Sequence, residues 1–221
     1  MESSLRARYD RTFSGIVDAI LKMGSMIEEA VQNAINSLQN RDTALAQEVV
    51  ERDAEVNALR FEIEEACLAL IATQQPAAGD LRAVIAAMNI VVDLERMGDH
   101  ASGIAKTVIR MGDQPLLKPL IDIPRMAKLA VEMLRGSLKA FVDVDPEAAQ
   151  AIAPRDEEMD FLYRAIFEEL VEIMARNPQG VERATYLLWT AHNLERIGDR
   201  VTNIAERVVF MSTGDVEELN V

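Results

Sequence analysis

The sequence predicts an all-α protein made of two tandem antiparallel three-helix bundles related by internal duplication. Its 221 residues are rich in apolar and charged types, but only 5% are aromatic and only 10 are glycine and 7 proline. Apolar residues recur at helical spacing over long segments. The stretch 93–100, DLERMGDH, recurs almost unchanged as NLERIGDR at 193–200, which is an offset of 100 residues.

The first half contains three long segments with an apolar stripe of helical period. We expect a first helix over residues 13–40 and a second over residues 43–74, with Asp42 as the cap of the second. Residues 75–79, QPAAG, interrupt the pattern, and a third helix follows over residues 80–111.

The second half repeats this series after a run of helix breakers that begins at Gly112. This run is the predicted domain boundary, which gives one bundle over residues 1–113 and another over residues 114–221. A fourth helix ends near Asp143. The fifth starts at Asp145 and Pro146, and residues 177–180 separate it from a sixth helix that runs to about residue 211. Pro154 is expected to bend or delay the fifth helix.

The two halves can be placed in register residue by residue. Asp42 corresponds to Asp145 and Asp53 to Asp156, both at an offset of 103 residues. The offset falls to 100 after the turn beside Gly79, so the first half has three extra residues there. An insertion confined to a loop is what a duplicated helical unit tolerates.

Composition narrows the function classes. There are 37 acidic and 23 basic residues, and the net charge of −14 argues against nucleic-acid binding because no basic run is present. Cys67 is the only cysteine, so no intramolecular disulfide can form, and a buried, reduced thiol suits the cytoplasm. No apolar run has the length of a membrane span or a secretory signal, so we expect membrane contact only through partners.

Each copy of the repeated motif places a glutamate and an aspartate four residues apart. On a helix these carboxylates lie about 40° apart on one face. The second and fifth helices carry further polar pairs at the same spacing, and each pair faces an acid motif if the helices are antiparallel neighbours. Such oxygen-rich sets suit cations such as Mg, Mn, Fe or Ca. The candidate metal ligands are Asp53, Asn57, Glu95 and Asp99 in the first half, and Asp156, Asp160, Glu195 and Asp199 in the second.

Other interpretations of these residues remain open. The acids can instead form ordinary ion pairs, such as Asp99 with Arg96. Gly98 and Gly198, which are costly inside a helix, permit either close helix packing or access of an ion to the acids. Four arginines can orient the carboxylates, bind an anion or simply balance charge; they are Arg52, Arg96, Arg155 and Arg196.

The sequence contains no catalytic signature, so we expect a protein that is not an enzyme. His192 lies about one turn from Glu195, but its repeat counterpart is Val92, and His100 points elsewhere. Neither histidine completes the Glu-x-x-His pattern of di-iron bundles, and phosphate loops and nucleophile elbows are missing. The alternative is a metal-dependent hydrolase or oxidase that uses the carboxylate clusters.

These features resemble the PhoU family of bacterial phosphate-signalling regulators over nearly the whole chain. The resemblance is carried by both Leu-Glu-Arg-(Met/Ile)-Gly-Asp copies and by several shorter stretches. These stretches are Met23-Gly24 with Met26, Arg52-Asp53 to Asn57, Glu65-Ala66-Cys67 with Gln75-Pro76, Asp80-Leu81-Arg82, and Asp156 to Asp160.

The resemblance implies a negative regulator of phosphate uptake and phosphate-regulon signalling. Such proteins link the ATPase subunit of the phosphate ABC transporter to a sensor histidine kinase, and members carry Fe, Zn, Mn or Mg on their acid motifs. We therefore expect a cytoplasmic homodimer that binds metal. Because Asn57 stands where the second half has Asp160, we expect the first site to be the weaker one.

Overall fold

The computed structural model describes residues 2–215 and 218–219 of the chain. Long α-helices dominate it, and the described residues contain no β-strand. Within them, no helix combines the length and apolar character needed to cross a bilayer. The helices are α1 (Glu2–Asn40), α2 (Thr43–Gln74), α3 (Gly79–Met111), α4 (Asp122–Asp143), α5 (Pro146–Gln150), α6 (Ala153–Arg176), the 3-10 turn η1 (Pro178–Gly180) and α7 (Val181–Thr213).

Local capping chemistry sets the starts of two helices at equivalent places in the repeat. The Asp42 side chain accepts a hydrogen bond of 2.9 Å from the backbone N–H of Leu45 at the start of α2. Asp145 accepts one of 3.0 Å from Ala148 at the start of α5, where Pro146 takes the first helical position. Both predicted caps are confirmed, as expected for a side-chain oxygen that satisfies a free N–H.

Two helices differ from their predicted extents. The first begins at Glu2 rather than at residue 13, since Tyr9 of its polar first turns is only 7% exposed and packs against the bundle. The fifth is divided into α5 and α6 by residues 151–152. Pro154 lies in the first turn of α6, where its missing N–H does no harm. The predicted interruption is therefore confirmed.

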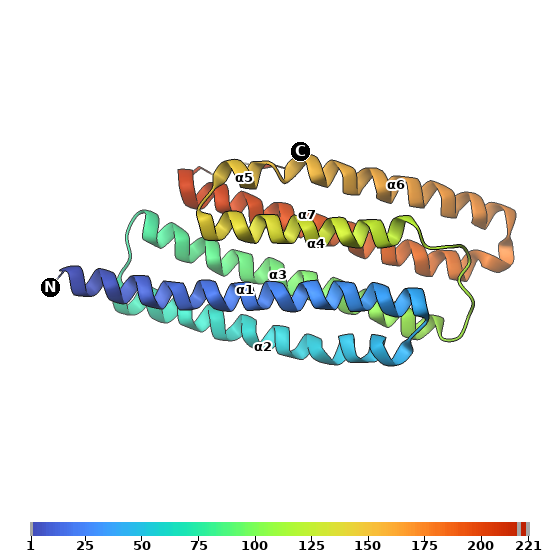
Figure 1. Ribbon diagram of the computed structural model, residues 1–221, viewed down its shortest axis with the longest axis horizontal. Helices are drawn as coiled ribbons and strands as arrows, with labels where there is room; N and C mark the ends of the chain where they lie inside the picture. Colours follow the sequence, from blue (N-terminus) through green and yellow to red (C-terminus); the bar gives the residue numbers. More distant parts are fainter. Residues whose placement is uncertain (1, 216–217, 220–221) are drawn as a thin grey trace.

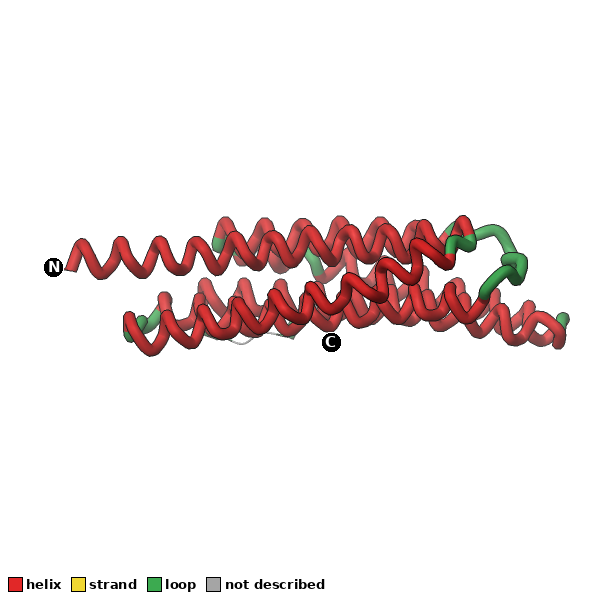
Figure 2. The backbone as a smooth tube through the Cα atoms, turned by 90° about the horizontal axis from the view of Figure 1, so that it is seen from below, coloured by secondary structure: helices red, strands yellow, loops and turns green. Residues whose placement is uncertain are grey.

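The helices form two antiparallel bundles that lie side by side along their length (Figure 1). Helices α1, α2 and α3 form one bundle, and α4, α6 and α7 form the other, with α5 continuing into α6 (Figure 1). The most extensive helix contact in the molecule joins α3 to α7, which run in opposite directions, and α1 also contacts α4. Figure 2 shows that loops are confined to the ends of the helices. The last helix of each bundle is therefore central to the whole fold.

The apolar core is continuous across the two bundles. It includes residues from α1 and α3 and, without a break, residues from α4 and α7, among them the fully buried Ile20, Met97 and Phe141. Cys67 is completely buried in it, as predicted, and burial raises the pKa of its thiol to about 11. The two bundles therefore share the hydrophobic driving force for folding.

Polar contacts across the α3–α7 seam follow the duplication. Asp93 of α3 lies 3.5 Å from Arg200 and accepts a hydrogen bond of 3.1 Å from Asn203. Its repeat counterpart, Asn193 of α7, lies 3.0 Å from Nδ1 of His100, the counterpart of Arg200. The seam thus has approximate two-fold symmetry with different residues on each side, and His100 faces α7 rather than an acid motif, as expected.

Candidate metal sites

The first candidate site lies between α2 and α3. Asp53 and Asn57 of α2 lie one turn apart, and Asn57 Nδ2 donates to the Asp53 backbone carbonyl at 3.2 Å and to Oδ2 at 3.4 Å. Burial raises the pKa of Asp53, and the nearby charges of Asp99 and Glu95 on α3 raise it further. Asp53 and Asn57 of α2 therefore lie near the acid motif of α3.

Arg60, which was not among the predicted site residues, pairs with one glutamate of this first site. Glu95 is 8% exposed, and its Oε1 accepts a hydrogen bond of 3.1 Å from Arg60 of α2. Arg60 also donates to Glu64 at 3.0 Å. The spacing 53, 57, 60 already placed Arg60 on the same helix face as the predicted ligands, so a complete count of that face would have found it.

The second candidate site lies between α6 and α7. Asp156 and Asp160 of α6 lie close enough to the α7 motif for their charges to act on Glu195, and Asp160 also acts on Asp199. Burial raises the pKa of Glu195 to about 7, and the charges of Asp199, Asp160 and Asp156 add to the rise. Burial also raises the pKa of Asp199, while Arg196 opposes the shift. Mutual repulsion therefore acts among these carboxylates.

The second site has no arginine in the place of Arg60, because the repeat counterpart at that position is Tyr163. The Oε2 atom of Glu195 is buried and accepts no hydrogen bond from the part of the chain that the structure describes. It lies 3.4 Å from Nδ1 of the half-exposed His192, whose ring centroid is 6.0 Å from that of Tyr163. Negative charge is therefore less compensated here than in the first site.

The donor atoms fit a cation in type but are not gathered around one point. Across residues 2–215 and 218–219, no three acidic, histidine or cysteine side chains are placed to ligate one ion together. Among the described residues, the buried Oε2 atoms of Glu95 and Glu195 accept no hydrogen bond, although Arg96 Nε lies 3.5 Å from that of Glu95. Binding would therefore require rotation of side chains toward a shared ion.

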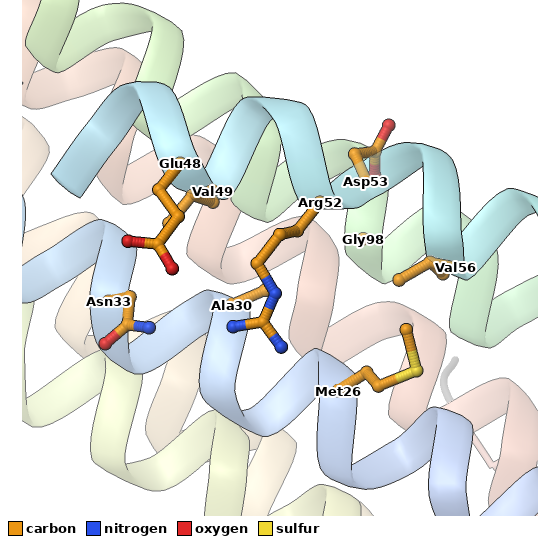
Figure 3. Close-up of a pocket in the computed structure, with 9 residues that line it drawn as sticks. All are labelled: Met26, Ala30, Asn33, Glu48, Val49, Arg52, Asp53, Val56 and Gly98. Atoms are coloured by element: carbon orange, nitrogen blue, oxygen red, sulfur yellow. The ribbon is translucent and has the colours of Figure 1, made fainter. Parts of the chain in front are cut away.

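The two glycines of the repeated motif pack closely against a carboxylate of the neighbouring helix. A Cβ atom on Gly98 would lie 3.3 Å from Oδ1 of Asp53, and one on Gly198 would lie 3.1 Å from Oδ1 of Asp156. Figure 3 shows Asp53 beside Gly98, at the edge of a cavity of about 20 Å³ between α1 and α2. Glycine here allows both close helix packing and the inward position of an acid.

The four arginines have two different roles. Arg96 contacts Asp99 at 3.1 Å and Arg196 contacts Asp199 at 2.7 Å, so both hold an acid of their own motif. For the other two, the structure favours the charge-balance alternative. The two pair with glutamates on the first helix of their own bundle: Arg52 with Glu29 at 2.5 Å and Arg155 with Glu132 at 2.6 Å. The adjacent Asp53 and Asp156 lie toward the acid motifs, whereas the side chains of Arg52 and Arg155 extend toward α1 and α4, where they balance the charge of a glutamate.

Comparison with known protein families identifies this arrangement. The PhoU domain model matches residues 20–108 and again residues 123–208, one match for each bundle. The chain belongs to the PhoU family. Both acid motifs and both facing pairs lie inside the matched ranges.

Relatives of known sequence or structure match this chain over nearly its whole length. A phosphate-specific transport system accessory protein PhoU homolog from Rhizobium meliloti is 36% identical, over 95% of this chain and 89% of that protein. The homolog from Zymomonas mobilis is 38% identical over 93% and 87%. The crystal structure of PhoU from Pseudomonas aeruginosa superposes with a TM-score of 0.89 at 33% identity, covering 94% of this chain and 100% of that one. The phosphate transport system regulatory protein PhoU from Streptococcus pneumoniae gives a TM-score of 0.88 at 32% identity, over 95% and 99%.

Proposed function

We propose that this chain is an accessory protein of phosphate transport that negatively regulates phosphate uptake and phosphate-regulon signalling. Membership of the PhoU family over both bundles is the observation that carries the proposal. Relatives at 36% and 38% identity are named as accessory proteins of the phosphate-specific transport system. The chain acts in the cytoplasm as a non-enzymatic helical adaptor, and contacts the membrane only through its partners.

The adaptor joins the ATPase subunit of the phosphate ABC transporter to a sensor histidine kinase, and works as a homodimer. A continuous core and rigid helices support such a role, because a partner that contacts one bundle can influence the other through the α3–α7 seam. Regulation then follows from protein contacts rather than from a chemical reaction.

Metal ions of the Fe, Zn, Mn or Mg type bind the acid motifs in this proposal, with the second site the stronger. Glu195 and Asp199 would hold the ion from α7, and Asp156 and Asp160 from α6. A bound cation would neutralise carboxylates that repel one another. The first site is weaker because Arg60 already occupies Glu95 and because Asn57 replaces a carboxylate.

Metal binding can be tested by calorimetric titration of chelator-treated protein with each ion separately. We expect a Glu195→Ala/Asp199→Ala variant to lose more affinity than the repeat-equivalent Glu95→Ala/Asp99→Ala variant. Equal binding by both variants and by the unmodified protein would remove metal from the proposal. Phosphatase or oxidase activity that Asp199→Ala abolishes would instead support the enzyme alternative.

The regulatory role can be tested in cells. Deleting the gene should derepress a phosphate-regulon reporter in phosphate-rich medium, and re-expression of the intact chain should restore repression. Normal repression in the deletion strain would refute the regulatory role, whatever the outcome of the metal titrations.

A further inference from the structure

An open groove runs along the surface between α1 and α2. Two hollows of about 400 Å³ and 330 Å³ lie along it, and both are walled by Leu59 and Glu62. The α1 wall extends from Thr12 to Met26, and the α2 wall from Arg52 to Ala66. Each wall spans fourteen residue steps, or about 21 Å at 1.5 Å per residue. This length matches about four turns of another helix.

The lining of the groove includes several small side chains. Gly15, Ala19, Ala58 and Ala66 are among its lining residues. Gly15 is informative because a Cβ atom there would meet nothing within 4 Å. Glycine inside a helix costs about 0.5–1 kcal/mol relative to alanine, and no contact with a described residue requires it at this position. Small residues along a groove allow a second helix backbone to approach closely.

The chemistry of the α2 rim is acidic and aromatic. Between Thr43 and Gln74 the helix carries seven acidic and two basic residues. On the α2 wall, Glu55 and Glu62 lie in the groove and Arg52 is held by Glu29, whereas Lys22 lies on the opposite α1 wall. Phe61 is 62% exposed and follows Ala58 by three residues, so it lies beside the groove. A second copy of this acidic helix would be repelled, and a basic flank would be attracted.

The described residues of the second bundle differ from the first at the positions that form this groove. Helix α4 begins at Asp122, the repeat counterpart of Ala19, so most of the wall that α1 provides is missing. The counterpart of Ala58 is the bulky Phe161, and the counterpart of Ala66 is Glu169, which pairs with Lys118. The duplication therefore offers a comparison within one chain, because the second bundle carries larger or charged side chains at these positions.

We propose that the α1–α2 groove docks an amphipathic helix of a partner protein. About fourteen residues of that helix lie in the groove, with small and apolar side chains against Gly15 and Leu59. Lys or Arg residues on the flank toward α2 contact Glu55 and Glu62. The role of this docking in the cell rests on the proposed adaptor function. The docking itself requires no metal.

The test uses the full-length chain, treated with a chelator, and a labelled synthetic 16-residue helix with alanine and leucine on one face and lysine on one flank. Fluorescence anisotropy should show saturable binding. We expect Gly15→Leu to weaken binding at least tenfold while the melting temperature stays equal or rises, since the new side chain points into open space. Glu55→Lys/Glu62→Lys should weaken binding similarly. The matched control is Ala165→Leu, an exposed α6 position in register with Glu62, which should leave the Kd unchanged.

Three results would overturn the proposal. They are the absence of saturable binding, a Kd that Gly15→Leu leaves unchanged, and an equal loss in Ala165→Leu. Sedimentation equilibrium adds a fourth, because a dimer that Gly15→Leu dissociates would assign the groove to a second copy of the chain. Since the assay contains neither metal nor phosphate, its failure is distinguishable from failure of the regulatory proposal.

Discussion

Replacing Glu195 with glutamine is expected to stabilise the metal-free protein at pH 8, whereas the same change at Glu95 is expected to destabilise it. The two residues are repeat equivalents with different surroundings. Burial, and then the charge of Asp199, raises the pKa of Glu195 from 4.5 to about 7. Glu95 instead accepts a hydrogen bond of 3.1 Å from Arg60.

The direction of the stability change expected for Glu195→Gln follows from proton linkage. Between pH 4.5 and 7 the folded state keeps a proton that the unfolded state has released, so stability falls as the pH rises through this window. The full shift corresponds to about 3 kcal/mol. The side chain is 19% exposed and solvent screens its charge, so we expect glutamine to recover about 1–2 kcal/mol at pH 8. The gain should vanish toward pH 4.5, where glutamate is itself neutral in the folded protein.

For Glu95→Gln the expected change is a loss of about 1 kcal/mol, because a charge-assisted hydrogen bond becomes a neutral one. Arg60 keeps its contact with Glu64, which limits the loss. Thermal unfolding in chelator at pH 8 and pH 5 measures both variants. A change of 1 kcal/mol corresponds to roughly 2–4 °C in a chain of this size. Shifts in the same direction for both variants, or a Glu195→Gln effect that is independent of pH, would refute the reasoning.

Three further predictions concern packing and reactivity. Cys67 is fully buried and the pKa of its thiol is raised to about 11. A thiol reagent at pH 8 should therefore label it at least 100-fold more slowly in native protein than in denaturant, as followed by absorbance. Arg200→Ala should cost about 1–3 kcal/mol in urea unfolding, because it removes a partner from Asp93, which is only 12% exposed in its side chain. Gly15→Ala should gain about 0.5–1 kcal/mol by the same measurement. Gly198→Ala should show no such gain, because its methyl group would lie 3.1 Å from a carboxylate oxygen of the facing helix.

The fold was predictable where the signal is local. Asp42, Asp145 and Pro146 mark helix starts through chemistry confined to one turn, and the repeat places three helices in each half. The first turns of α1 have no such signal, because Tyr9 is secured by distant contacts. Its hydroxyl donates a hydrogen bond of 3.0 Å to the backbone carbonyl of Asp80, 71 residues along the chain.

The sequence could predict which helices of the candidate sites face each other, but not the direction or partner of each side chain. Duplication alone put Asp53 opposite the motif of α3 and Asp156 opposite that of α7. The direction of Arg52 depends on which flank of α2 packs against α1, and spacing along one helix does not determine this. The difference between Arg60 and Tyr163 was visible in the sequence, but its meaning required knowing that position 60 reaches Glu95.

The α3–α7 seam has the form of a subunit interface whose two partners now share one chain. In a symmetric homodimer, a substitution on one side is imposed on the other. Covalent fusion removes that coupling, so Asp93 faces Arg200 on one side of the seam while Asn193 faces His100 on the other. The same freedom lets one bundle hold an arginine against its glutamate while the other leaves its glutamate uncompensated. A single polypeptide can thereby give its two acid motifs different surroundings, which a symmetric dimer of identical subunits cannot do.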